Sequence, residues 1–194
     1  MSHYYAYDDQ LKSLEKTITY NFKGHTFLFK TDFGVFSKDR VDDGSDLLLH
    51  AITEEHDRSN ILDIGCGYGV LGCVLKHVYP QASVTMFDIN PRAVELARKN
   101  TTHLVDVVVF ESSQVPGEGY DLAVINPPIR AGKQVIFSLY QQAYDALIPK
   151  GVLYVVISKR HGAPSTVTFL KTMFDDVKRV DKAKGYDVYK AIKY

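Results

Sequence analysis

The stretch ILDIGCGYGVLG, residues 61–72, joins a short apolar run to a glycine-rich turn. Residues 61–64 have the length and composition of a buried strand, and apolar residues then recur with a helical period over residues 70–78. Glycine allows the backbone to turn sharply and allows a ligand to approach it closely. The stretch therefore predicts a strand, a ligand-binding turn and a helix in succession.

The alternation of strands and helices continues along the chain. One helix is expected to begin at Asn90-Pro91, with Asn90 as its N-cap, and another covers about residues 134–148. Further strands are predicted at residues 83–87, 105–110, 122–125 and 152–157. Strands that alternate with helices at this spacing form a parallel sheet with helices on both faces.

Both ends of the chain are predicted to add antiparallel hairpins, with turns at Lys23-Gly24 and Gly185-Tyr186. Their strands are residues 17–22 and 26–29 at one end and 177–180 and 188–192 at the other. We expect an α/β fold with a Rossmann-like, seven-stranded, mostly parallel sheet and a C-terminal antiparallel hairpin. Residues 42–194 would form this single globular unit, and residues 1–41 a β-hairpin extension packed on it.

The composition is that of an ordinary globular protein, with 45% hydrophobic and 24% charged residues in 194 positions. Lys and Arg balance Asp and Glu at 23 each, but residues 150–194 carry ten basic and four acidic side chains. No apolar run approaches the roughly 18–20 residues of a membrane span, and no signal-peptide pattern is seen. Because Cys66, Cys73 and seven scattered histidines form no disulfide or metal-ligand pattern, we expect a cytoplasmic protein without a metal.

The glycine-rich turn is compatible with two classes of ligand. Gly67, Gly69 and Gly72 satisfy the dinucleotide pattern GxGxxG, and Asp88 follows 21 residues after Gly67, at the end of the next strand. Both NAD-binding and S-adenosylmethionine-binding folds place an acid there for the ribose hydroxyls. Asp63, just before the first glycine, favours a cationic ligand over a pyrophosphate, although it could instead accept hydrogen bonds from local backbone amides.

The tetrapeptide Asn126-Pro127-Pro128-Ile129 directly follows the predicted strand at residues 122–125. Ligands of open α/β sheets bind outside the carboxyl ends of the strands, so this segment faces the glycine-rich turn. The prolines stiffen the backbone, and the Asn side-chain oxygen beside a proline carbonyl gives two acceptors for an NH₂ group. Such a grip would direct a poorly nucleophilic nitrogen toward an electrophilic methyl group, with no metal or covalent nucleophile required.

Together these segments resemble the class I S-adenosylmethionine-dependent methyltransferases. They are similar in particular to the RsmC-type 16S ribosomal RNA guanine-N2 methyltransferases, in a compact one-domain form. The resemblance is carried by DFGVFSKDRVDDGSDLLL (32–49), ILDIGCGYGVLG (61–72), FDINPRAVELARKN (87–100) and INPPIRAGK (125–133).

The resemblance implies a role for individual residues. Asn126 and Pro127 would be catalytic, since they would grip the target amine, and Phe36 with Ser37 would close over the cofactor or substrate. The cofactor S-adenosylmethionine would be bound by Asp63, Gly65, Gly67, Gly69, Asp88, Asn90, Ser112, Ser113 and Asn126.

The substrate side departs from the family at one position. Ile129 stands where many amine methyltransferases have Tyr or Phe to stack on the target base. Substrate contacts are expected from Phe36, Pro128, Ile129, Arg130, Lys133, Lys159 and Arg160. Basic side chains that could hold RNA phosphates, or else form a solvated face, are His161, Lys178, Arg179, Lys182 and Lys184.

The resulting interpretation is an N-methyltransferase acting on guanine N2 of small-subunit ribosomal RNA. The partner would be ribosomal RNA or the small ribosomal subunit, with no membrane and no obligate protein partner. Alternatives are a methyltransferase of protein glutamine or adenine N6, a catalytically silent S-adenosylmethionine-binding module, or an NAD oxidoreductase. The last has no evident acid for hydride transfer and no use for the Asn-Pro-Pro segment.

Overall fold

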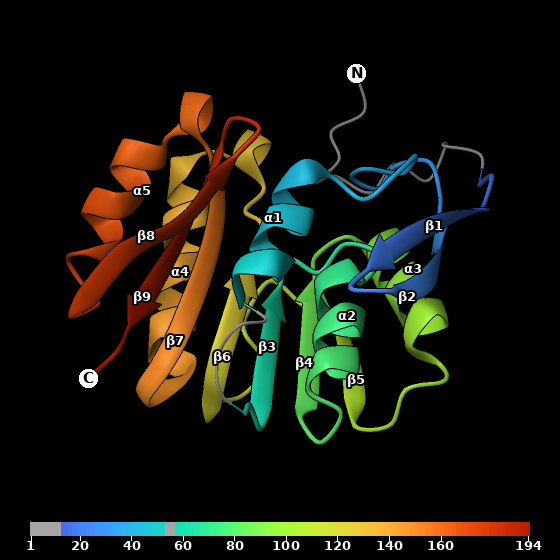
Figure 1. The fold of residues 1–194 in the computed structure, drawn as a ribbon, viewed down its shortest axis with the longest axis horizontal. Coiled ribbons are helices and arrows are strands. Elements are labelled where there is room, and N and C mark those ends of the chain that lie inside the picture. The colour runs from blue at the N-terminus through green and yellow to red at the C-terminus, as the bar shows by residue number, and fades with distance from the viewer. Residues whose placement is uncertain (1–12, 53–56) are drawn as a thin grey trace.

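The structure is a computed structural model that describes residues 13–52 and 57–194. Its main sheet has seven strands in the order β5-β4-β3-β6-β7-β9-β8 (Figure 1). The strands are β3 (Asn60–Ile64), β4 (Ser83–Asp88), β5 (Val107–Glu111), β6 (Tyr120–Ile125), β7 (Leu147–Ser158), β8 (Asp176–Ala183) and β9 (Tyr186–Ile192). The first five pair in parallel and the last two add antiparallel at one edge, which confirms the predicted sheet.

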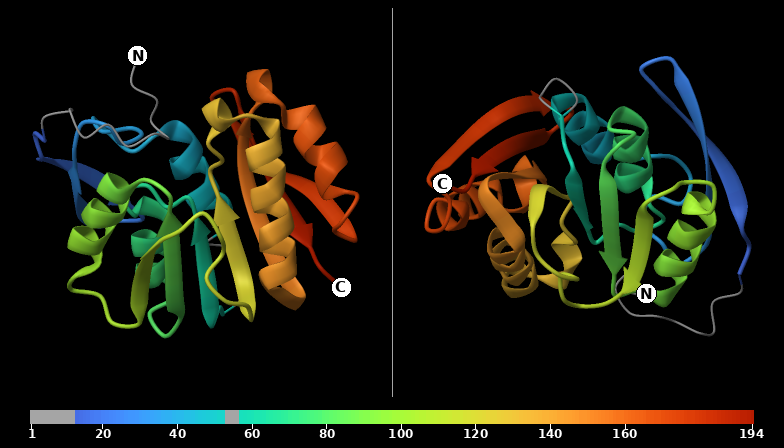
Figure 2. Two further views of the ribbon diagram at one scale, coloured as in Figure 1. Left: turned by 180° about the vertical axis from the view of Figure 1, so that it is seen from behind. Right: turned by 90° about the horizontal axis from the view of Figure 1, so that it is seen from below.

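Helices cover both faces of this sheet, as predicted (Figures 1 and 2). The helices are α1 (Asp43–Ile52), α2 (Val70–Val78), α3 (Pro91–Thr101), α4 (Lys133–Ala146) and α5 (Ala163–Leu170), with short 3₁₀ turns η1 (Ile129–Ala131) and η2 (Lys159–His161). Side chains of β6 alternate between the faces: Leu122 and Val124 pack with α1, α2 and α3, and Ala123 and Ile125 with α4 and α5. None of the described helices is long and apolar enough to cross a membrane.

Two helices were not expected from the sequence, and one turn was misplaced. The first part of α1 and all of α5 lack a clear helical repeat of apolar residues. The C-terminal hairpin turns at Lys184-Gly185, with φ angles of 49° and 84°, so Tyr186 is the first residue of β9 rather than a turn residue. A two-residue turn of this kind needs positive φ at both positions, which glycine tolerates and an aromatic residue does not.

The N-terminal hairpin consists of β1 (Lys16–Phe22) and β2 (His25–Thr31). Its buried side chains belong to the same hydrophobic cluster as α1, α2 and α3. The Asn100 amide fixes β2 to α3, because its Oδ1 accepts from Lys30 N at 2.8 Å and its Nδ2 donates to Lys30 O at 3.0 Å. The same Nδ2 also donates to the carbonyl of Tyr68 in the glycine-rich turn, at 2.8 Å. The hairpin is therefore fixed to both α3 and that turn.

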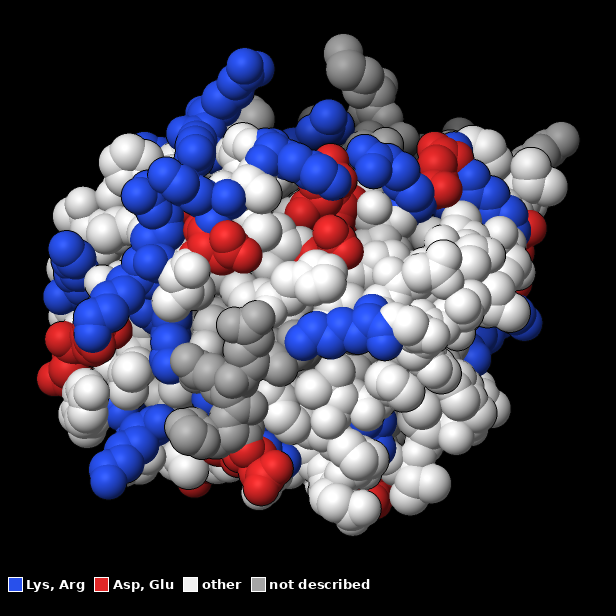
Figure 3. Space-filling model, viewed as in Figure 1, with Lys and Arg blue, Asp and Glu red and all other residues white. Residues whose placement is uncertain are grey.

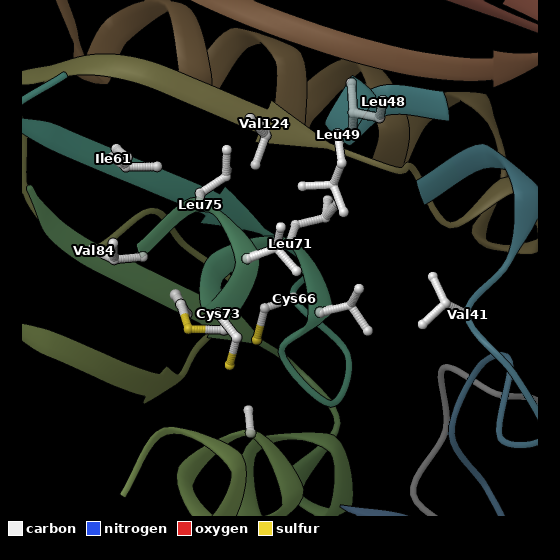
Figure 4. Close-up of a cluster of buried hydrophobic side chains, with 14 of the residues drawn as sticks. Val41, Leu48, Leu49, Ile61, Cys66, Leu71, Cys73, Leu75, Val84 and Val124 are labelled. Carbon is white, nitrogen blue, oxygen red and sulfur yellow. The ribbon is translucent and has the colours of Figure 1, made fainter. Parts of the chain in front are cut away.

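The two cysteines lie in this cluster, between α2 and its neighbours (Figure 4). Both Cys66 and Cys73 are buried free thiols. Burial raises the pKa of Cys73 to about 12 and raises that of Cys66 well above its ordinary value. They are therefore packing residues, as small apolar side chains would be.

Candidate functional site

A cavity of about 750 Å³ opens at the carboxyl ends of the central strands. Its size is in the range of about 300–1,000 Å³ that small-molecule sites occupy. The walls come from the glycine-rich turn, the ends of β4, β5 and β6, and the loop before α1. The described residues that line it include Phe36, Ser37, Asp42, Ser45, Gly65, Gly67, Asp88, Asn90, Ser112, Ser113, Asn126, Pro127, Pro128, Ile129, Arg130 and Tyr186.

The glycines of the turn divide into two groups. A Cβ added at Gly65 or Gly67 would meet nothing within 4 Å, so their bare backbone borders the open cavity, with φ angles of 66° and 55°. A Cβ at Gly69 would lie 3.0 Å from Met86 Cε, and one at Gly72 would lie 2.6 Å from Met86 Sδ. Gly69 and Gly72 thus allow α2 to pack closely on β4, while Gly65 and Gly67 leave space for a ligand.

Asp88 ends β4 and faces the cavity beside the glycine-rich turn. Its Oδ2 accepts a hydrogen bond from Gly67 N at 2.9 Å, and its Oδ1 accepts one from Asn90 N at 2.8 Å. Burial raises the pKa of this carboxyl, although the backbone hydrogen bonds oppose the shift. Asn90 caps α3 as predicted, because its Oδ1 accepts from Arg92 N at 3.1 Å.

Asp63 lies behind the turn, fully buried and not among the cavity-lining residues. Its Oδ2 accepts from Gly72 N at 2.9 Å, at the start of α2. Its Oδ1 has no hydrogen-bond partner among the residues that the structure describes. Burial, together with the nearby charge of Asp88, raises the pKa of Asp63 to about 7, so the carboxyl gains a proton far more easily than an exposed one.

Asn126 follows β6, and its side-chain amide has a fixed orientation. Nδ2 donates to Asp42 Oδ1 at 3.1 Å and to Ser45 Oγ at 3.0 Å. A carboxylate can only accept, so the amide nitrogen must be the atom that faces Asp42. The amide oxygen of Asn126 is therefore free to accept, and Asn126 and Pro127 both line the cavity.

No local pattern indicates that Asp42 and Ser45 contact Asn126. Asp42 precedes α1 and caps it, because its Oδ1 accepts from Gly44 N at 3.0 Å and from Ser45 N at 3.1 Å. An acid before a helix is common, and 84 residues separate it from Asn126. Only the fold brings the two segments together.

The predicted substrate residues are only partly brought together. Phe36, Pro128, Ile129 and Arg130 line the cavity, but Lys133, Lys159 and Arg160 do not. Tyr186, which the sequence analysis assigned to a turn, lines it as well. Its ring lies so close to the first turn of α1 that a Cβ at Gly44 would be 3.1 Å from Tyr186 Cε1.

Lys and Arg side chains gather over the β8–β9 hairpin (Figure 3). Several of them have acidic neighbours: Lys184 contacts Asp43 at 2.8 Å, and Lys159 and Arg179 each lie 3.7 Å from the buried Asp187. Lys182 is exposed in the same hairpin. The side chain of His161 lies outside the described residues.

Known proteins resemble this chain in both sequence and structure. A family model described as the methyltransferase small domain matches residues 26–190. The Bacillus subtilis protein YbxB is 38% identical over 98% of each chain. Ribosomal RNA small subunit methyltransferase C of Pasteurella multocida is 36% identical over 63% of this chain but only 39% of its own length.

A solved structure of the Thermus thermophilus 16S rRNA N2 G1207 methyltransferase, in complex with AdoMet and guanosine, has a TM-score of 0.84 and 27% identity. The match covers 95% of this chain and 52% of that one. The chain thus spans about half the length of this relative, or less in the case of the Pasteurella multocida protein.

Proposed function

The chain belongs to the methyltransferase small domain family, and from that premise we propose that it methylates the N2 amine of a guanine in small-subunit ribosomal RNA. The single observation that carries this proposal is the orientation of Asn126. Its amide nitrogen is held by Asp42 and Ser45, so its oxygen, together with the Pro127 carbonyl, would present two acceptors to the cavity. Two adjacent acceptors suit the two N–H groups of an aromatic amine.

The residues around the cavity fit S-adenosylmethionine as the methyl donor. Space at Gly65 and Gly67 allows a ligand to lie against the backbone, and the Asp88 carboxylate, which lines the cavity, would accept from ribose hydroxyls. Ser112 and Ser113 line the end of the cavity beside β5, where they would contact the adenine. The similar Thermus thermophilus enzyme was solved with this donor and with guanosine. Asp63 and Gly69 would act indirectly, by supporting the turn.

The chemistry needs little more than positioning from the protein. When bound, S-adenosylmethionine supplies a methyl group on a sulfonium, whose sulfur keeps the bonding electrons and leaves as a neutral thioether. Asn126 Oδ1 and the Pro127 carbonyl would accept hydrogen bonds from both N–H groups of the amine, which would hold the nitrogen lone pair toward the methyl carbon. As the new C–N bond forms and the S–C bond breaks, positive charge develops on the nitrogen beside these two oxygens. The extra proton is then lost to solvent.

The part of the cavity wall that includes Phe36 and Tyr186 would suit an RNA base that is flipped out of its stack. Phe36 is half exposed at the mouth of the cavity, and the ring of Tyr186 lies on the side of Asn126. Either ring could stack on the base in place of the aromatic residue that Ile129 replaces. Basic residues of the β8–β9 hairpin would lie along the RNA backbone. Ribosomal RNA or the small subunit as substrate would make the protein cytoplasmic.

The test is transfer of tritiated methyl groups from S-adenosylmethionine to 30S subunits, free 16S RNA or total protein, followed by nucleoside analysis. Asn126→Ala should abolish the label in N2-methylguanosine. The matched control is Asn60→Ala, which should behave as the unchanged protein. Asn60 is an exposed asparagine at the start of β3, at the end of the strand away from the glycine-rich turn.

Three outcomes would contradict the proposal. Label in N6-methyladenosine or in protein would mean another amine target with the same chemistry. Cofactor binding with no label in any substrate would favour a silent binding module. Thermal stabilisation by NAD rather than by S-adenosylmethionine would exclude a methyltransferase altogether.

A further inference from the structure

Asp42 has a second oxygen that its structural role does not use. Its Oδ1 accepts three hydrogen bonds, from Gly44 N, Ser45 N and Asn126 Nδ2, at 3.0 to 3.1 Å. Among the described residues, none donates a hydrogen bond to Oδ2. Asp42 is half-buried and lines the cavity, so this oxygen remains available to a bound substrate.

The position of Asp42 is rigid. Rotation of its carboxylate would break the cap of α1 and release Asn126 at the same time. Gly44 leaves no room on the other side, because even a Cβ there would lie 2.9 Å from Asp42 Oδ1 and 3.1 Å from the Tyr186 ring. The carboxylate therefore has a fixed place beside the two acceptors that would hold the target amine.

The amines that compete as targets differ in the group next to the nitrogen. In guanine, the N2 amine is flanked by N1–H, which is a donor. In adenine, the N6 amine is flanked by N1, which is an acceptor, and in a glutamine amide the neighbour is a carbonyl oxygen. A carboxylate beside the amine site can accept from the guanine N1–H but repels the lone pair of the other two.

Building on the proposed function, we propose that Asp42 selects guanine by accepting the N1–H of the target base while it also positions Asn126. Asp42, Asn126 and Pro127 then offer three acceptor oxygens to the three donor hydrogens along one edge of guanine. Selection would occur when the base enters the site, before methyl transfer.

The test is binding of guanosine, inosine and adenosine to the protein saturated with S-adenosylhomocysteine, measured by NMR titration. Inosine keeps N1–H but lacks the amine that Asn126 holds, so it separates the two roles of Asp42. Asp42→Asn keeps an oxygen for the cap, since Asn caps helices as well as Asp does, and replaces the second oxygen by a donor. It should weaken guanosine and inosine alike, by about ten- to a hundredfold, the range of a lost hydrogen bond to a charged group.

Asn126→Ala is the comparison variant and should weaken guanosine while leaving inosine unchanged. Adenosine should bind Asp42→Asn at least as well as it binds the unchanged protein. Affinity for S-adenosylhomocysteine should stay the same in Asp42→Asn, which shows that the cavity is intact. The effect on inosine is the decisive readout, because loss of Asn126 positioning alone cannot produce it.

The two levels of inference fail in different ways. If the unchanged protein binds guanosine no better than adenosine, the proposed guanine target is wrong. If it prefers guanosine and inosine but Asp42→Asn leaves inosine binding unchanged, then Asp42 only positions Asn126 and the selection role is wrong.

Discussion

The buried carboxyl of Asp63 should make the stability of the fold depend on pH. Its pKa in the folded protein is about 7, against an ordinary value of 3.8, because burial and the charge of Asp88 outweigh the hydrogen bond from Gly72. Between these two values the folded state holds a proton that the unfolded state has lost. The free energy of unfolding therefore falls as pH rises through this window, and below it the penalty is absent.

The size of the effect follows from the shift. About three pH units at 1.36 kcal/mol each give a loss on the order of 4 kcal/mol between pH 4 and pH 7, a large part of the typical 5–15 kcal/mol of a domain. Asp63→Asn cannot ionise, and its side-chain oxygen can still accept from Gly72 N. In this variant the side-chain amide nitrogen would take the place of Oδ1 and would be buried without a hydrogen-bond partner. We therefore expect the variant to lose the pH dependence and also to have a free energy of unfolding that is lower by a constant amount at every pH.

Urea unfolding of both proteins at several pH values between 4 and 8 measures this difference. The stability of the variant relative to the unchanged protein should rise by several kcal/mol from pH 4 to pH 7 and level off above it. Asp145→Asn, an exposed aspartate on α4, is the control and should leave the pH profile unaltered. Parallel curves for Asp63→Asn and the unchanged protein would refute the argument, since no proton would then be bound at this site on folding.

Two further predictions concern the substrate side of the cavity. Ser45→Ala removes one of the two acceptors that hold the Asn126 amide nitrogen. Steady-state kinetics should show kcat reduced about fivefold, as expected for the loss of about 1 kcal/mol, with cofactor affinity unchanged. An unaltered kcat would mean that Asp42 alone is enough to orient Asn126. Tyr186→Leu should raise KM for the RNA about tenfold if its ring stacks on the target base, whereas Tyr186→Phe should not; equal effects of Leu and Phe would point to the hydroxyl instead.

The sequence was sufficient to predict those elements that are specified by a pattern of neighbouring residues. The glycine-rich turn, the Asn90 cap and the strand before Asn126 all lie where their patterns predicted. The two roles of the glycines were not predictable, because the difference between Gly67 and Gly72 depends on Met86, which approaches only one of them. A glycine pattern shows which positions lack a side chain, but it does not show whether a neighbouring residue or a ligand fills the space beside them.

Charge was the least predictable property of the site. Lys159 was expected to contact the substrate, and in the fold it lies 3.7 Å from Asp187, as does Arg179. Asp187 comes from β9, which pairs with the end of β7 only after the C-terminal hairpin has added to the sheet. A cluster of basic residues in the sequence therefore does not predict the net charge of the surface on which those residues lie in the fold.

The loop that leads to Asp42 is attached to the opposite side of the cavity. The loop between β2 and α1 is fixed at three points: Asn90 Nδ2 donates to Gly34 O at 3.1 Å, Arg92 donates to Phe33 O at 2.8 Å and the Tyr68 hydroxyl donates to Ser37 O at 3.1 Å.

The three donors belong to the glycine-rich turn, to α3 and to its N-cap residue, on the side proposed for the cofactor. The loop then continues into Asp42, which holds Asn126 on the side proposed for the substrate. A single segment thus links both halves of the cavity. Because the amine must meet the methyl group within a few tenths of an ångström, this link would fix the two reactants relative to each other.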